Sequence, residues 1–336
     1  MKYFYVERQK VSNSFVKLWP RFLMLFLITI VSTTIVNSQI LTDFPCYAVS
    51  EDNSPPNILF VFDPVANAWS PVGPTGGTNI EAIATDPLTD IIYAIDNGQF
   101  GMLDPATGAF TAIGGGVGVA NGPIGPIDLD DVDGLTYDPI NMILYASHRV
   151  GGTGPGTNDL LFQIDVATGT FVPNAMIDPN TGAAADYAVV PQVFDNSFNG
   201  DVYDVDDIAY NPYTGQLFAI QNQDGPGTIT ELNILTGEVE AVIYDLPDDD
   251  VEGLGFTYLG ELYATTGDNG STQQASNSFI FIDLAAGTTL PLLPIDPTGV
   301  EVDFESFDCL TAFNDLALDK LLDPCLLYTS PSPRDS

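Results

Sequence analysis

The sequence predicts an all-β fold, a five-bladed β-propeller made of four-stranded antiparallel blades. Three observations favour it: an acidic motif that occurs five times, turns that recur after each copy, and a repeat unit divided between the two ends of the repeat region. The motif is an acidic or amide residue, one spacer, a second acid and, two residues later, a large apolar residue. Its copies begin at Asn79, Asp131, Asp204, Asp250 and Asp303.

The spacing of the motif supports a repeat array. Its second acids are 52, 73, 46 and 53 residues apart, a period typical of propellers rather than of one wound domain. They are Glu81, Asp133, Asp206, Glu252 and Glu305. Each copy therefore marks the start of one unit.

Each unit contains the signals for four strands. The motif leads into a first strand and a turn in which Pro follows Asp or Asn, as at Asp86-Pro87, Asp138-Pro139 and Asn211-Pro212. The second strand carries an aromatic residue followed by Ala: Tyr93-Ala94, Tyr145-Ala146, Phe218-Ala219 and Tyr263-Ala264. The third strand ends in a turn whose last residue is Gly, at Gly108, Gly169, Gly237 and Gly287. A short fourth strand follows.

The phase of the units predicts how the ring closes. Residues 46–72 supply strands two to four of a blade, and residues 305–311 supply a first strand without a blade. The late strand completes the early blade, which places Cys309 beside Cys46 and predicts a disulfide across the seam. Two unpaired buried thiols are the alternative for this pair. A linear β-solenoid is the alternative fold, but it does not predict a divided blade.

The ends of the chain are read separately from the repeats. Residues 1–38 have a basic leader and an apolar run, Phe22 to Val36, typical of a secretory signal. The alternative is a membrane anchor, but the run is shorter than the roughly 20 residues a span needs. We expect the propeller over 39–312 and a linker over 313–324. Residues 325–336 look like the in-frame translation of a sequencing adapter, so we exclude them from the fold.

The charge of the expected mature segment limits its partners. Of the 45 Asp and Glu, only Glu7 and Asp335 fall outside 39–324, and of the eight Lys and Arg only Arg149 and Lys320 fall inside, a net charge of about −41. Nucleic acid is excluded as a partner, because neutralising phosphates requires a basic surface. An anionic membrane surface is disfavoured for the same reason, and no membrane insertion is expected after signal cleavage.

The acids are predicted to meet at one mouth of the central channel, which the first strand of each blade lines. Three interpretations stay open. The first acid of each copy accepts backbone hydrogen bonds while the second faces water; or the clustered carboxylates share a hard cation such as Ca²⁺; or a carboxylate pair catalyses hydrolysis. The candidate metal ligands are Glu81, Asp131, Asp133, Asp204, Asp206, Asp250, Glu252, Asp303 and Glu305.

Other candidate chemistry is limited. His148 and Arg149 are adjacent at the start of a polar loop, where they are candidates for contact with an anionic ligand or simply a solvated pair. No nucleophile elbow, phosphate-binding glycine loop or zinc-spaced Cys/His cluster is present in the sequence. We therefore predict no catalytic residue.

The units resemble the N-terminal propeller domain of large bacterial cell-surface proteins, with their Leu-Tyr-Ala strands and Asp-x-x-Thr-Gly turns, over about residues 44–312. Residues 315–320, Asp-Leu-Ala-Leu-Asp-Lys, resemble the first strand of the immunoglobulin-like repeats that follow such domains. One copy, Asp250 to Leu254, is similar to an Asp-x-Glu-Gly motif of calcium-dependent phytase-like propellers, which also use several lysines and arginines that this chain lacks.

The first resemblance implies a secreted protein attached to the cell surface through further C-terminal domains. The sequence then favours a non-catalytic recognition module for an extracellular glycan or protein, monomeric as a domain and responsive to Ca²⁺. The alternative is an extracellular hydrolase that cleaves glycans or esters with the ring carboxylates.

Overall fold

The computed structural model of the protein describes residues 45–50, 57–63, 68–150, 159–191, 204–222, 226–249, 251–257, 259–266, 279–291 and 304–310. This part of the chain is all-β, and it contains no helix long and apolar enough to cross a membrane. The predicted signal peptide, the segment 313–324 and residues 325–336 lie outside it. So do Asp250 and Asp303, two of the predicted metal ligands.

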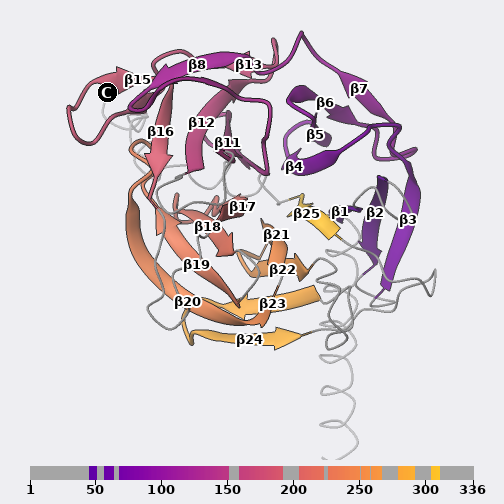
Figure 1. Ribbon diagram of the computed structural model, residues 1–336. Coiled ribbons are helices and arrows are strands. Elements are labelled where there is room, and N and C mark those ends of the chain that lie inside the picture. Colours follow the sequence, from indigo (N-terminus) through magenta and orange to yellow (C-terminus); the bar gives the residue numbers. More distant parts are fainter. Residues whose placement is uncertain are drawn as a thin grey trace, which may run out of the picture. The chain divides into compact units, whose positions relative to one another are not determined.

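Five antiparallel sheets of four principal strands form the blades (Figure 1). Blade 1 combines the two ends of the described chain: β25 (Phe304–Cys309), β1 (Cys46–Ser50), β2 (Ile58–Asp63) and β3 (Ala68–Pro74). Blade 2 consists of β4 (Ile80–Asp86), β5 (Ile91–Asp96), β6 (Gln99–Leu103) and β7 (Phe110–Ala112). The divided blade predicted from the sequence is therefore present.

The other three blades are continuous in sequence. Blade 3 consists of β10 (Gly134–Asp138), β11 (Ile143–His148), β12 (Asp159–Asp165) and β13 (Thr170–Phe171), with β16 (Tyr187–Val190) also paired to β12. Blade 4 consists of β17 (Asp204–Tyr210), β18 (Leu217–Asn222), β19 (Pro226–Leu232) and β20 (Val239–Asp249). Blade 5 consists of β21 (Val251–Phe256), β22 (Leu262–Thr266), β23 (Phe279–Asp283) and β24 (Thr288–Pro291).

Two hairpins lie outside this pattern. Hairpin β8–β9 (Val119–Gly122 and Gly125–Asp128) lies between blades 2 and 3. Hairpin β14–β15 (Met176–Ile177 and Ala184–Ala185) lies between β13 and β16.

The first strands of the blades close into a ring. Each inner strand contacts the next in the order β25, β4, β10, β17, β21 and back to β25. The five-bladed propeller is therefore confirmed, and the linear solenoid is excluded because a solenoid has no contact between its first and last units.

A disulfide fixes the seam of the ring. Cys46 of β1 lies directly opposite Cys309 of β25, and the two are joined although they are 263 residues apart in sequence. Next to it, Trp69 is 2% exposed and its ring centroid lies 4.9 Å from Phe304 of blade 1 and 5.6 Å from Phe279 of blade 5. The covalent bond closes blade 1, and the aromatic packing joins it to the last blade.

Side-chain oxygens join neighbouring inner strands, which belong to different sheets and share no ladder. Ser306 Oγ accepts from Ile83 N at 3.1 Å, and Asp308 Oδ2 accepts from Thr85 N at 2.7 Å. The same kind of bond links later blades, where Thr136 Oγ1 accepts from Tyr210 N at 2.8 Å and Asp207 Oδ2 from Leu254 N at 2.9 Å. These bonds satisfy buried backbone donors that have no strand partner on that side.

Glycine replaces the oxygen-bearing side chain where two inner strands approach most closely. A Cβ at Gly134 would lie 2.9 Å from Ile208 N, and a Cβ at Gly253 would lie 2.8 Å from Phe307 N. Both contacts are too short for any larger residue without a shift of the backbone. The residue after the second acid is therefore either a hydrogen-bonding partner of the next blade or small enough to let that blade approach.

We predict that the double substitution Cys46→Ser, Cys309→Ser destabilises the protein by about 5 kcal/mol, because the disulfide closes a very long loop in the unfolded chain. Urea denaturation of the wild type and the double variant measures the difference. A reducing agent should lower the stability of the wild type by a similar amount and leave the double variant unchanged. Equal stability of oxidised wild type and variant would contradict a closing role for the bond.

Asp308 provides a prediction on pH. Burial raises the pKa of its carboxyl to about 7, although hydrogen bonds from Thr85 and from the Cys309 backbone oppose the shift. The folded protein holds this proton more tightly than the unfolded chain, so the contribution of Asp308 is full below about pH 4 and is lost as the pH rises to about 7. By linkage the loss is about 4 kcal/mol at most.

The substitution Asp308→Asn should remove this component while keeping an oxygen that can accept from Thr85. Denaturation at pH 4.5 and 7.5 tests the prediction, because the wild type should lose more stability between the two values than the variant. Self-repulsion of the acidic chain acts on both proteins and cancels in the comparison. Parallel pH profiles would contradict the raised pKa.

Candidate functional site

The second acids of all five motif copies line one cavity on the ring axis. Its walls are formed by one carboxylate from each blade together with a single cation, and its volume is about 230 Å³. The lining residues are Glu81, Asp133, Asp206, Glu252, Glu305 and Arg149. The structure thus brings together five of the nine predicted metal ligands, and their binding of a metal stays a prediction.

A bulge in the inner strand directs four of these acids toward the axis. In blade 2, Ile80 and Ala82 pair with the consecutive residues Asp96 and Ile95, so Glu81 is the extra residue of the strand. Such a bulge turns the side chain of the extra residue out of the regular alternation. Register shifts occur at the same motif position in three further blades, around Asp206, Glu252 and Glu305.

Blade 3 reaches the same arrangement with a shorter strand. Asp133 immediately precedes β10, and beyond it Arg149 N donates to Asp131 O at 2.9 Å. The equivalent bond in blade 2 runs from Asn97 N to Asn79 O at 3.2 Å. Pairing therefore resumes on the far side of Asp133, as it does around Glu81.

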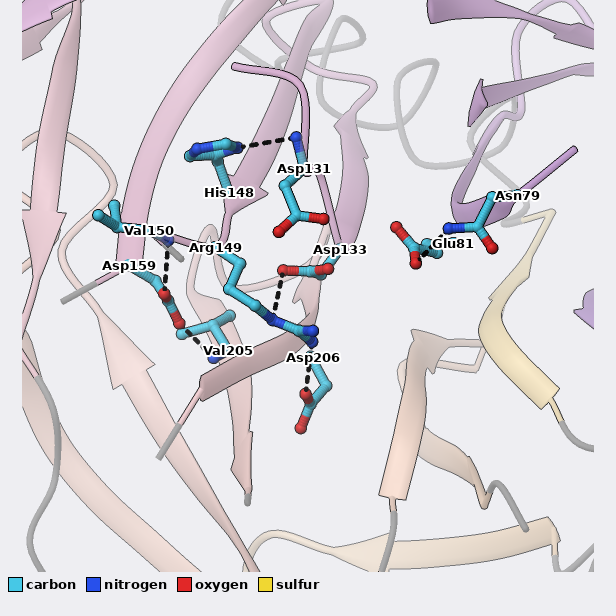
Figure 2. Close-up of polar contacts among 10 residues, drawn as sticks. All are labelled: Asn79, Glu81, Asp131, Asp133, His148, Arg149, Val150, Asp159, Val205 and Asp206. Carbon is cyan, nitrogen blue, oxygen red and sulfur yellow. Dashed lines mark hydrogen bonds and ion pairs between the residues drawn. The ribbon is translucent and has the colours of Figure 1, made fainter. Parts of the chain in front are cut away.

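Arg149 extends from the end of β11 between two carboxylates of the cavity (Figure 2). Its Nε lies 3.5 Å from Asp133 Oδ2, and its Nη2 lies 3.7 Å from Asp206 Oδ1. Both distances exceed the roughly 2.7–2.9 Å of a hydrogen-bonded ion pair, and 40% of the Arg149 side chain is exposed. The guanidinium therefore lies near the carboxylates of Asp133 in blade 3 and Asp206 in blade 4 without a short hydrogen bond to either. One positive charge thus faces five acids in the cavity.

Asp133 differs from the other acids of the cavity. It is only 4% exposed, and its Oδ2 accepts no hydrogen bond within the described structure. Burial raises the pKa of Asp133 well above its ordinary value; Arg149 opposes the shift, whereas Asp131, Glu81 and Asp206 add to it. The ring is therefore not five equivalent carboxylates, contrary to what the similarity of the motif copies suggests.

One side of the cavity has a spacing that suits a metal ion. Glu81, Asp131 and Asp133 each offer an oxygen, and the three oxygens lie within 4.8 Å of one another. Because Ca²⁺ binds oxygens at roughly 2.3–2.6 Å, one ion could contact all three. Asn79 holds Glu81 in place by donating its amide to Oε1 at 2.5 Å. The first residue of this motif copy thus orients the second, and does so with its side chain.

His148 does not begin a solvated loop as the sequence predicts. It is the last residue of β11, it is 3% exposed, and its Nδ1 accepts from Asp131 N at 3.2 Å (Figure 2). Burial lowers the pKa of His148, against the effect of nearby Asp131, Asp130 and Asp128. A neutral His148 orders the backbone of the motif, and its predicted contact with an anionic ligand stays a prediction, as does that of Arg149.

Two buried acids outside the predicted set support the cavity. Asp159 accepts from Val205 N at 2.5 Å and Val150 N at 3.4 Å, and so ties the backbone after Arg149 to blade 4 (Figure 2). Asp207 accepts from Ser306 Oγ at 3.1 Å, a bond that crosses from blade 1 to blade 4. Both Asp207 and Ser306 are fully buried, so protein fills the channel one residue beyond the acids that line the cavity.

The fold and the cavity together define a disulfide-closed five-bladed propeller with an acidic central site. Neither a protein-family model nor a curated protein matches the chain.

Solved structures resemble the chain only distantly. A nidogen/laminin complex has 14% identity and a TM-score of 0.42, over 76% of this chain and 77% of that one. A putative 6-phosphogluconolactonase from Bacteroides fragilis NCTC 9343 has 10% identity and a TM-score of 0.43, over 79% of this chain and 97% of that one. A protein of unknown function from Bacteroides caccae has 10% identity and a TM-score of 0.39, over 77% of each chain. The assignment of fold and site therefore rests on the strands and contacts of this chain.

Proposed function

We propose that the chain is a non-catalytic recognition or display module of an exported bacterial surface protein, and that Ca²⁺ binding at the acidic cavity stabilises it. The partner would be an extracellular glycan or protein. The observation that carries the proposal is the convergence of one carboxylate from every blade on a single cavity. An ion held by Glu81 of blade 2 and by Asp131 and Asp133 of blade 3 would join two neighbouring blades at the centre of the ring.

The electrostatics of the cavity favour a cation. Carboxylates held this close repel one another, and burial of Asp133 increases the cost of its charge. Arg149 offsets one negative charge, so most of the repulsion is left. A hard divalent ion with oxygen ligands relieves it directly, and the oxygens of Glu81, Asp131 and Asp133 have a compatible spacing.

Export is supported by the closing bond of the ring. The Cys46–Cys309 disulfide is of the kind that persists in oxidising compartments. The high negative charge keeps such a protein dispersed. Attachment to a cell surface rests on the resemblance of residues 315–320 to the start of an immunoglobulin-like repeat.

We predict that 10 mM CaCl₂ raises the melting temperature by about 5 °C, as expected for a site with a dissociation constant of about 0.1–1 mM. The double substitution Glu81→Gln, Asp133→Asn should abolish the rise, because it removes two of the three clustered ligands. Differential scanning calorimetry with and without Ca²⁺ measures the effect.

Glu238→Gln, Glu240→Gln is the matched control. It removes the same number of charges from exposed positions near and on β20, so it should leave the calcium-induced rise intact. Loss of the rise in both variants would indicate a general charge effect. No rise in the wild type would contradict the calcium site.

An extracellular hydrolase is the second candidate, and the inequality of the ring acids is the observation that favours it. A buried Asp133 with a raised pKa beside other carboxylates is an arrangement that can supply a general acid and a general base. We predict that any turnover of a glycan or ester panel is lost in Glu252→Gln. A panel without turnover by the wild type would count against this candidate.

A further inference from the structure

The acidic cavity already contains a cation of its own. The guanidinium of Arg149 lies beside Asp133 and Asp206, and it is the only basic group that lines the cavity in the described part of the chain. Asp133 belongs both to this ion pair and to the group of three oxygens with metal-like spacing. The two positions for a positive charge therefore share one carboxylate.

Asp133 is also the most buried of the acids that line the cavity. It is more than nine-tenths buried, it lines the cavity, and its Oδ2 accepts no hydrogen bond although Arg149 Nε lies 3.5 Å away. A buried carboxylate oxygen without a donor is costly, and a directly coordinated cation removes that cost. This oxygen points to a ligand more strongly than the number of acids does.

We propose that Arg149 is an internal competitor for the cation site: a divalent cation binds to Glu81, Asp131 and Asp133 by displacing the guanidinium from Asp133. The inference rests on the proposed calcium site and assigns its regulation. Two positive charges that share one carboxylate repel each other, so the positions are occupied alternately.

The contacts of Arg149 suit such a displacement. Its contacts with Asp133 and Asp206 are longer than hydrogen bonds, and 40% of its side chain is exposed, so leaving Asp133 breaks no short bond to that carboxylate. Its backbone is fixed by the bond from Arg149 N to Asp131 O. The Arg149 side chain can therefore move away from Asp133 while the backbone around Asp131 stays in place. Arg149 would make the affinity for Ca²⁺ lower than that of the bare carboxylates and so set the calcium concentration to which the module responds.

Chemical labelling of wild-type protein tests displacement without a mutation. Phenylglyoxal modifies accessible guanidinium groups, and mass spectrometry follows Arg149 separately from the chain's other arginines. We expect saturating Ca²⁺ to increase the labelling rate of Arg149 at least about threefold, since the ion replaces its pairing with Asp133. Ca²⁺ binding, seen by calorimetry, with an unchanged labelling rate would overturn the inference and leave the proposed function standing.

Titration of variants gives an independent readout. At pH 8, Arg149→Gln should bind Ca²⁺ about tenfold more tightly than the wild type, because a repelling charge is gone. Arg149→Lys keeps the charge and should stay within about threefold. Equal affinities of wild type and Arg149→Gln would overturn the inference.

The two proposals can fail separately. If only Arg149→Gln binds Ca²⁺, Arg149 is a competitor and the calcium response proposed for the wild type is wrong. If neither protein binds Ca²⁺, both proposals are overturned. Should Arg149→Gln fail to fold, the labelling of the wild type decides.

Discussion

The close packing of five inner strands around one axis is the constraint on which the rest of the structure depends. In two blades the next inner strand leaves no room for a side chain at the residue after the second acid, which explains Gly134 and Gly253. Where a larger residue stands there, as at Asp207 and Ser306, its oxygen bonds the next inner strand. The bulge before this position then directs the acid toward the axis. Packing of the ring and convergence of the carboxylates are thus two results of one backbone geometry.

The buried acids of the ring have two different roles that burial alone does not separate. Asp207 and Asp308 each accept from the backbone of the following residue and from another inner strand, so the second kind of bond replaces a missing ladder bond. Burial raises the pKa of both, yet their hydrogen bonds oppose that shift. Asp133 is also buried with a raised pKa, but its Oδ2 has no such donor and only a loose ion pair. Hydrogen-bond donors therefore distinguish acids that join blades from an acid that lines the cavity.

Features that recur in every unit could be predicted from the sequence, and features that occur once could not. The motif period, the turns and the phase of the units give five blades, the divided blade and the pairing of Cys46 with Cys309. The convergence of the second acids follows from their place at the start of each inner strand. The burial of His148 and the reach of Arg149 depend on contacts made in one blade only. The bond from Ser306 to Asp207 joins residues 99 apart across the ring, and no local pattern encodes it.

The five carboxylates that the repeats bring to the cavity need positive charge among them, and Arg149 supplies it on one side only. Bulges in four inner strands and the segment just before β10 in blade 3 bring five carboxylates to one axis, and carboxylates at short range can all stay ionised only if positive charge lies among them. Arg149 supplies a single charge and supplies it to one side, next to Asp133 and Asp206. The opposite side, with Glu252 and Glu305, does not share these two ion pairs, and the trio that includes Glu81 shares only Asp133. Because one guanidinium cannot neutralise five acids and lies beside only two of them, the electrostatic environment of the ring acids depends on a contact made in one blade alone.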